Sequence, residues 1–227
     1  MQKRTLLFPL GVAVFLISAT AFSSAYLHSI DTSFSGYLSG LMLNFWGGEQ
    51  NQLIRVNLYN HSIALYENGD LYTSARIAGT GNPNNRTATP TGKFRILSKD
   101  KRHISGLSGA IMPYSLRFYE GYYFHDIPLY PSGEVITTRY SAGCIRLPTA
   151  LAANMFDWAH IGAYVEIYSA KLARAEDAQT VYLLTEDGYR QPIATEHAFL
   201  SRGYQWKDVV VVPAGELSGL PIGGYIQ

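Results

Sequence analysis

The 227-residue chain contains a single cysteine, Cys144. One thiol cannot close a disulfide within the chain, so the sequence offers no internal cross-link. A lone cysteine is either a small buried apolar side chain or a reactive thiol. Cys144 lies in Ser141–Leu147, between strand-like sequence and a helical pattern. In that setting it is a candidate nucleophile.

Charge of either sign is also scarce, with 18 Lys and Arg against 17 Asp and Glu and a formal net charge of +1. A balance so close to zero gives no support for nucleic-acid binding. The six histidines are scattered, and neither a paired-cysteine spacing nor a His-Glu-x-x-His pattern is present. A metalloenzyme is therefore a weak alternative, and we expect neither a metal nor another cofactor.

Aromatic residues are abundant, since 17 Tyr and 10 Phe occur in short runs with Val, Ile and Thr. Such runs favour strands, so we expect a mainly β protein. Strand-like stretches fall at residues 53–58, 62–66, 71–78, 93–97, 114–118 and 122–125. A helix is predicted over 148–160, where Leu151, Met155 and Trp158 recur at helical spacing.

The N-terminus differs from the rest of the chain. Lys3 and Arg4 precede the apolar run Leu6–Ile17, and small residues follow it. This order is typical of a secretory signal, although the run approaches the ~20 residues that span a bilayer. Residues 1–25 are predicted to be a signal peptide or a membrane anchor, and 26–50 a tether. The remainder is expected to be exported, in the periplasm or cell envelope.

His125 ends one of the predicted strands and precedes the only cysteine. A thiol needs a nearby base to become a thiolate at neutral pH, and histidine is the side chain best matched to that task. We therefore predict that Cys144 is the nucleophile and His125 its general base and proton donor.

A series of short motifs runs through residues 53–168. In chain order they are Leu65–Gly69, Thr89–Gly92, Met112–Tyr114, His125, Ser141–Leu147 and Gly162–Ile167. In order and spacing they resemble the L,D-transpeptidase catalytic domain, or YkuD domain, of bacterial cell-wall enzymes. The Gly-Cys-Ile-Arg element is the most specific of them. The resemblance implies a β-sandwich or meander with a helix after the catalytic cysteine.

The resemblance also implies a substrate and a reaction. Cys144 would attack a tetrapeptide stem of peptidoglycan, release D-alanine and keep the stem as an acyl-enzyme. An amine of a neighbouring stem or of a cell-wall protein would then accept it. Water as acceptor would make the protein an L,D-carboxypeptidase. The alternative to an enzyme is a non-catalytic protein that binds the cell wall, in which Cys144 is merely buried.

Two positions depart from the family pattern: Ala142 stands where many members have histidine, and Asp126 where they often have glycine. Because the side chain of alanine forms no hydrogen bonds, Ala142 does not supply those that this histidine would make. The backbone carbonyl of Asp126 is expected to orient the His125 ring, which tolerates a change of side chain.

Four further residues are candidates for oxyanion or substrate binding. Gly143 would let backbone and substrate approach closely, and its N–H would join that of Cys144 as an oxyanion donor. Ser141 is a turn hydroxyl or a site donor. Arg146 binds an anion or pairs with an internal acidic residue. Tyr114 donates its hydroxyl to the pocket or packs in the sheet.

The expected organisation is a catalytic domain over 51–169, a linker over 170–179 and a small α+β surface or wall-associated module over 180–227. The module is marginal in size, so it is expected to lean on the catalytic domain. Its aromatic residues form either a small core or a surface for stacking on glycans; they are Phe199, Tyr204 and Trp206.

Overall fold

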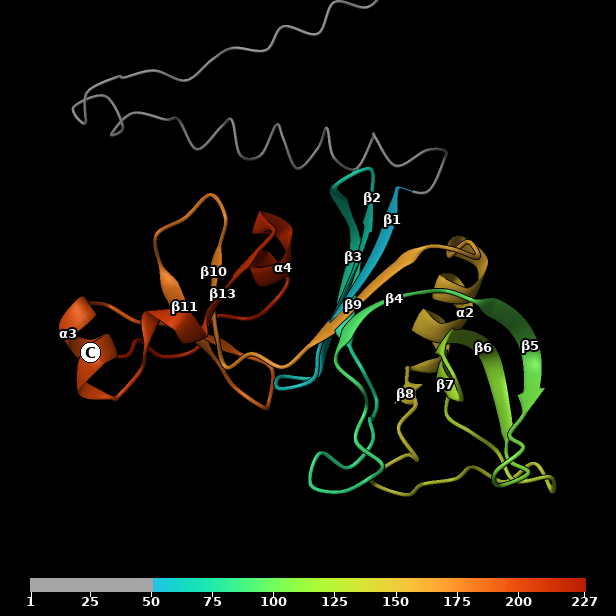
Figure 1. The fold of residues 1–227 in the computed structure, drawn as a ribbon. Coiled ribbons are helices and arrows are strands. Elements are labelled where there is room, and N and C mark those ends of the chain that lie inside the picture. Colours follow the sequence, from blue (N-terminus) through green and yellow to red (C-terminus); the bar gives the residue numbers. More distant parts are fainter. Residues whose placement is uncertain (1–50) are drawn as a thin grey trace, which may run out of the picture. The chain divides into compact units, whose positions relative to one another are not determined.

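The structure is a computed structural model that describes residues 51–227 (Figure 1). The predicted signal peptide or anchor and the tether, residues 1–50, lie outside the described residues. Across 51–227, none of the helices combines the length and the apolar character needed to cross a bilayer.

The first sheet has five strands in the order β3-β2-β1-β9-β4. Their bounds are β1 Gln52–Asn57, β2 Ser62–Glu67, β3 Asp70–Arg76, β4 Gly92–Arg95 and β9 Tyr164–Tyr168. The turn between β2 and β3 has positive φ at both Asn68 (54°) and Gly69 (90°). Asn-Gly favours this hairpin turn, because both residues tolerate the left-handed conformation. Strand β9, the last of the five in sequence, pairs in parallel with β1. It therefore occupies an inner position of the sheet, between β1 and β4.

The second sheet has the order β5-β6-β7-β8 and carries the candidate nucleophile at one edge. Its strands are β5 Ser98–Ile104, β6 Ile111–Tyr119, β7 Tyr122–His125 and β8 Ile145–Arg146, and helix α2 Thr149–Trp158 follows. One hydrophobic core joins both sheets and α2; it includes Ile54, Leu65, Phe118, Phe124, Ile145 and Met155. The prediction of a mainly β fold with a helix after the cysteine is confirmed.

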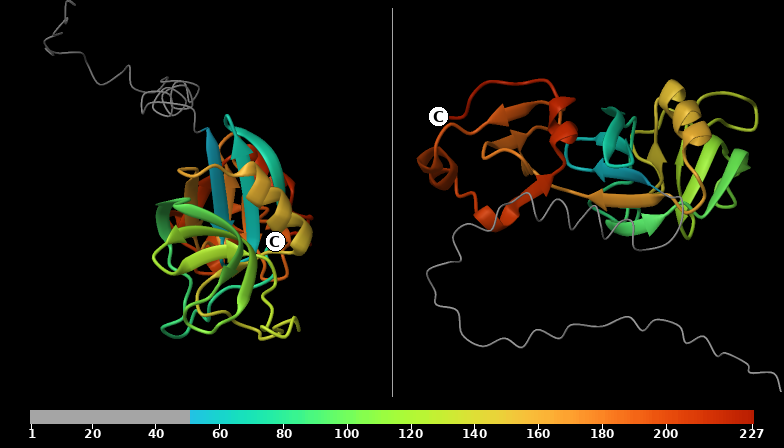
Figure 2. Two further views of the ribbon diagram at one scale, coloured as in Figure 1. Left: turned by 90° about the vertical axis from the view of Figure 1, so that its right-hand side faces the viewer. Right: turned by 90° about the horizontal axis from the view of Figure 1, so that it is seen from above.

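The C-terminal part forms a third sheet, seen in orange and red in Figure 2. Its strand order is β12-β11-β10-β13. Its elements are β10 Leu172–Ala175, β11 Val181–Leu184, β12 Arg190–Pro192, α3 Glu196–Ser201, the 3₁₀ turn η1 Trp206–Asp208, β13 Val209–Val212 and α4 Ala214–Ser218. The expected linker 170–179 therefore contains β10, a central strand. Leu172, Ala173 and Ala175 are buried, so this segment belongs to the module.

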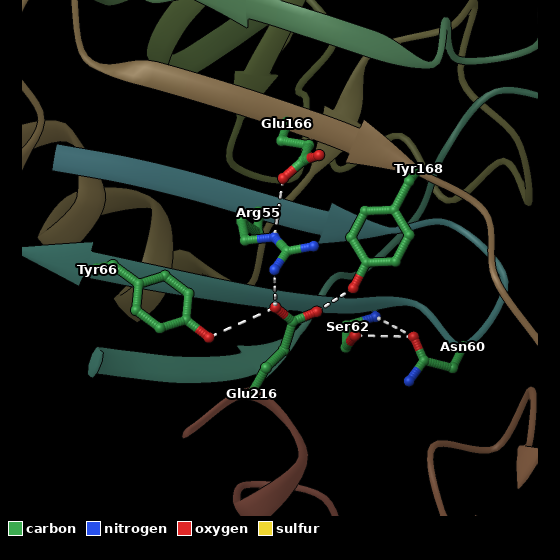
Figure 3. A network of polar contacts seen from close by, with 7 residues as sticks. All are labelled: Arg55, Asn60, Ser62, Tyr66, Glu166, Tyr168 and Glu216. Atoms are coloured by element: carbon green, nitrogen blue, oxygen red, sulfur yellow. Dashed lines mark hydrogen bonds and ion pairs between the residues drawn. The ribbon is translucent and has the colours of Figure 1, made fainter. Parts of the chain in front are cut away.

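A buried ionic cluster joins α4 of the module to the first sheet (Figure 3). Arg55 Nη1 lies 3.2 Å from Glu216 Oε2, and Arg55 Nε lies 3.1 Å from Glu166 Oε2. Tyr66 and Tyr168 both donate their hydroxyls to the Glu216 carboxylate. A buried charge is tolerated only when it is paired and hydrogen-bonded. The cluster therefore fixes α4 against β1, β2 and β9.

Candidate active site

The strand that ends at His125, β7, runs parallel to and beside β8, which directly follows Cys144. In this pair Phe124 lies opposite Ile145, and His125 lies opposite Arg146. Phe124 and Ile145 are fully buried in the core. Because successive side chains of a strand point to opposite faces, His125 and Cys144 share the face turned away from that core. In this register Cys144 falls opposite Tyr123, two residues before His125.

The Cys144 thiol is only 8% exposed and lies beside β7. Its Sγ is 3.8 Å from the carbonyl oxygen of Gly121, and the backbone N–H of Tyr123 hydrogen-bonds the sulfur. Burial raises the pKa of the thiol, while the Tyr123 amide and the charge of Arg146 act against that rise. Cys144 therefore rests as a thiol and needs a base to become nucleophilic.

The His125 ring is held in one orientation. Its Nδ1 donates to the backbone carbonyl of Asp126 at 2.5 Å, the contact that the sequence led us to expect. A carbonyl oxygen can only accept, so Nδ1 carries the proton and Nε2 is the basic nitrogen. Burial lowers the pKa of His125 to about 4, although the Asp126 carbonyl opposes that shift. The imidazole is neutral at pH 7.

The Asp126 side chain connects this histidine to the helix that follows the nucleophile. Its Oδ1 accepts hydrogen bonds from the Ile127 N–H at 2.6 Å and from the Thr149 hydroxyl at 2.8 Å. Thr149 is the first residue of α2. Aspartate at this position therefore supplies a contact between β7 and α2 that glycine would lack.

The turn that carries Cys144 is held by Ser141. Its Oγ accepts from the Gly143 N–H at 3.0 Å and donates to the Cys144 carbonyl at 2.6 Å. Ser141 is therefore a turn hydroxyl here. The Gly143 N–H is already bonded, which leaves the Cys144 amide as the freer of the two expected oxyanion donors. Gly143 has φ +117°, and a Cβ there would overlap the Tyr122 ring.

Thr89 braces the same turn from the other side. Its hydroxyl donates to the Gly143 carbonyl at 2.9 Å and accepts from the Gly81 N–H at 3.0 Å, and the residue is 6% exposed. A Cβ on Gly81 would come within 2.8 Å of the Gly143 Cα. The sequence identified Thr89 only as part of a motif; the bond to Gly143 has no local signal.

Arg146 contacts backbone in the segment that leads into the cysteine turn. Its guanidinium donates to the Thr138 carbonyl at 2.5 Å, the Thr138 hydroxyl at 3.0 Å and the Tyr140 carbonyl at 3.5 Å. The sequence suggested an anion or an acidic residue as its partner, whereas these bonds go to uncharged oxygens. Arg146 therefore positions the segment before Ser141, and its charge favours a thiolate at Cys144.

Tyr114 lies in β6 with φ 54°, and its ring meets the Phe156 ring of α2 edge to face at 5.8 Å. It also packs against the main hydrophobic core. These contacts correspond to the packing role.

Sequence reasoning missed His103 as a neighbour of the site. Its Nδ1 lies 3.3 Å from Asp100 Oδ2, and its ring stacks on Tyr123 with 4.6 Å between centroids. Its charge, when present, helps to lower the pKa of His125. The strand that places it was not predicted. Among residues 51–227 no three histidine, cysteine or carboxylate groups gather closely enough to hold a metal ion.

The second sheet and the turn that leads into it thus carry a buried thiol and a neutral imidazole on adjoining segments. The family model of the L,D-transpeptidase catalytic domain (YkuD) matches residues 51–167, more than half of the chain. The protein therefore belongs to the YkuD family of L,D-transpeptidase catalytic domains. No protein with a curated description matches the chain.

Several solved structures are similar to this chain. An L,D-transpeptidase from Stackebrandtia nassauensis is 20% identical over 54% of this chain and 57% of its own, with a TM-score of 0.45. One from Mycobacterium smegmatis is 21% identical over 52% and 59%, with a TM-score of 0.41. The C442S mutant of an Enterococcus faecium L,D-transpeptidase is 24% identical over 52% and 50%, with a TM-score of 0.44. Each match spans less than two thirds of the solved chain.

Proposed function

We propose that the protein is a peptidoglycan L,D-transpeptidase that works through an acyl-enzyme on Cys144. The observation that supports this proposal is the pairing of β7, which ends at His125, with β8, which follows Cys144; the thiol is buried and the imidazole is oriented and neutral. Membership of the YkuD family supplies the substrate class, a tetrapeptide stem. The apolar N-terminal sequence supports a location outside the cytoplasm, in the periplasm or cell envelope.

The first half-reaction uses His125 as base and then as acid. Nε2 of His125 takes the proton of Cys144 Sγ, and the thiolate attacks the carbonyl that precedes the terminal D-alanine. The Cys144 N–H donates to the oxyanion that forms. When the C–N bond breaks, His125 gives its proton to the nitrogen of D-alanine. The stem remains attached to sulfur as a thioester.

The second half-reaction returns the enzyme to its resting state. An acceptor amine attacks the thioester carbonyl while Nε2 of His125 takes a proton from it. The C–S bond then breaks, and the sulfur of Cys144 regains the proton from His125. With an amine of a second stem or of a protein lysine the product is a cross-link or an attached protein. With water in its place the protein would be an L,D-carboxypeptidase.

Both groups are neutral at rest, because burial lowers the pKa of His125 and raises that of Cys144. The proton transfer is thus uphill until charge develops on the substrate. The positive charge of Arg146 and the amide of Tyr123 stabilise the thiolate at that stage.

The test is the intact mass of the full-length protein after incubation with a carbapenem or a tetrapeptide stem. The parent should gain one acyl group, Cys144→Ser none, and His125→Ala should gain it at least tenfold more slowly. His160→Ala is the matched control, because His160 is an exposed histidine of the same domain. A folded parent that stays unmodified and releases no D-alanine would favour the wall-binding alternative. Product masses distinguish an amine acceptor from water.

A further inference from the structure

A cavity of about 220 Å³ lies between the β2–β3 hairpin and the C-terminal module, away from Cys144. Its lining includes aliphatic side chains from both parts, with Ile63 and Ala75 from the sheet and Leu220 from the module. Polar groups are few and come from both sides; they are Ser62, Ser74, Arg76, Asp187, Tyr189 and Glu216. A mainly apolar wall with a few converging polar groups is typical of small-ligand sites.

The two walls of the cavity are held at a fixed separation by close backbone contacts. A Cβ on Gly188 would overlap the Arg76 guanidinium, and one on Gly219 would overlap the Ser74 hydroxyl. Arg76 Nη2 also donates to the Glu186 carbonyl at 2.9 Å. The module therefore lies directly on β3, and the cavity is formed where the two meet.

Glu216 and Ser62 are fixed side chains of the cavity wall, and Figure 3 shows both beside the ionic cluster. Glu216 is 7% exposed and is held by Arg55 and two tyrosine hydroxyls. The Ser62 hydroxyl donates to Asn60 Oδ1 at 2.7 Å, which leaves its oxygen free to accept a hydrogen bond. Glu216 thus contributes a fixed part of the wall, and Ser62 contributes an oriented hydrogen-bond acceptor.

The rim of the cavity favours a sugar ring. Tyr189 lines the cavity and is 43% exposed, so part of its apolar ring is accessible to a ligand. Arg76 supplies donors and Asp187 acceptors for hydroxyl groups. A pyranose has both an apolar C–H face and a fringe of hydroxyls. A zwitterionic amino acid could also meet Arg76 and Asp187, but it would leave the aromatic ring of Tyr189 without a partner.

We propose that this cavity binds one N-acetylhexosamine unit of a glycan strand. The volume is below that of typical ligand pockets of roughly 300–1,000 Å³, so it has room for a single ring rather than an oligosaccharide. The proposal rests on the proposed function, because peptidoglycan presents such sugars beside the peptide stem. The cavity is then a second binding site for the substrate, separate from Cys144.

The test measures binding of tri-N-acetylchitotriose and of peptide-free glycan strands to the full-length protein by calorimetry. Tyr189→Ala and Asp187→Asn should each weaken binding at least fivefold. Tyr225→Ala is the matched control, because Tyr225 is 72% exposed in the same module and does not line the cavity. Its binding should equal that of the parent. Thermal unfolding identifies any variant that fails to fold; Asp187→Asn, at an exposed site, then carries the test.

Three results would overturn the inference: no binding of either sugar probe, equal losses in the Tyr189 and Tyr225 variants, or tighter binding of D-alanine or a stem peptide at this cavity. Carbapenem acylation of Cys144 is measured on the same samples. A parent that acylates but binds no sugar refutes the cavity and leaves the proposed function intact. A parent that binds sugar through Tyr189 but is not acylated supports the cavity and refutes the proposed function.

Discussion

Replacing Thr89 with valine tests whether the Thr89 hydroxyl holds the cysteine turn. The substitution keeps the shape of the side chain and removes both of its hydrogen bonds, to the Gly143 carbonyl at 2.9 Å and from the Gly81 N–H at 3.0 Å. Thr89 is 6% exposed, so water cannot readily take its place. Two buried backbone groups lose their partner, and one of them belongs to the residue before Cys144.

An unsatisfied buried polar group costs roughly 1–3 kcal/mol, so two of them lower the free energy of unfolding by about 2–6 kcal/mol. In a protein of this size each kcal/mol shifts the melting temperature by about 2–4 °C, and we expect a fall of roughly 5–20 °C. Because a displacement of about 1 Å can cost a hundredfold in rate, acylation of Cys144 should slow at least tenfold.

Thermal unfolding followed by circular dichroism gives the first quantity, and carbapenem acylation followed by intact mass gives the second. Thr91→Val is the control: the same substitution in the same motif, at an exposed residue. It should leave both quantities unchanged. If Thr89→Val melts within about 2 °C of the parent and acylates at the same rate, the bridging role of the hydroxyl is refuted.

Burial lowers the pKa of His125 from 6.5 to about 4, so the unfolded chain binds a proton first as the pH falls. The free energy of unfolding should therefore fall by about 3 kcal/mol between pH 6.5 and pH 4, and His125 should contribute no further change below pH 4. Urea titrations of His125→Gln should lack this pH dependence. Parallel pH profiles for the variant and the parent would contradict the prediction. Arg146→Lys keeps the charge but loses the fork of donors, so acylation should slow about tenfold; a rate equal to the parent's would remove its positioning role. Glu216→Gln leaves Arg55 without one of its two carboxylates and should cost about 2–4 kcal/mol in urea unfolding, whereas an unchanged midpoint would show that the cluster adds no net stability.

Alternating strands and the Asn68-Gly69 turn were predictable because one face of each strand is buried and the turn type demands these residues. Strand β5 was not, since Ser98–Ile104 is highly charged and lies at a sheet edge, where it pairs only with β6. Strand β10 was missed for a related reason. Leu172–Ala175 has alanine and arginine in place of β-branched residues, and its burial comes from partners distant in sequence.

In the candidate site, the lone thiol and the preceding histidine could be proposed from residue types alone. The residues that hold their surroundings in place could not be predicted in this way. Thr89 and Arg146 act on backbone carbonyls of Gly143 and Thr138. A backbone acceptor is present at every residue and leaves no mark in the sequence, so such bonds become visible only once the loops are placed.

The ionic cluster around Glu216 has a practical consequence for dissecting the protein. Removing the module would strip Arg55 of a buried partner and uncover the side of β3 on which Gly188 and Gly219 rest. A shortened catalytic domain would thus keep Arg55 with only one of its two carboxylate partners, and it would expose to water the part of β3 that the module covers. Any loss of activity on truncation would first report damage to the scaffold, and single substitutions at the module's outer surface are the cleaner instrument for studying recognition.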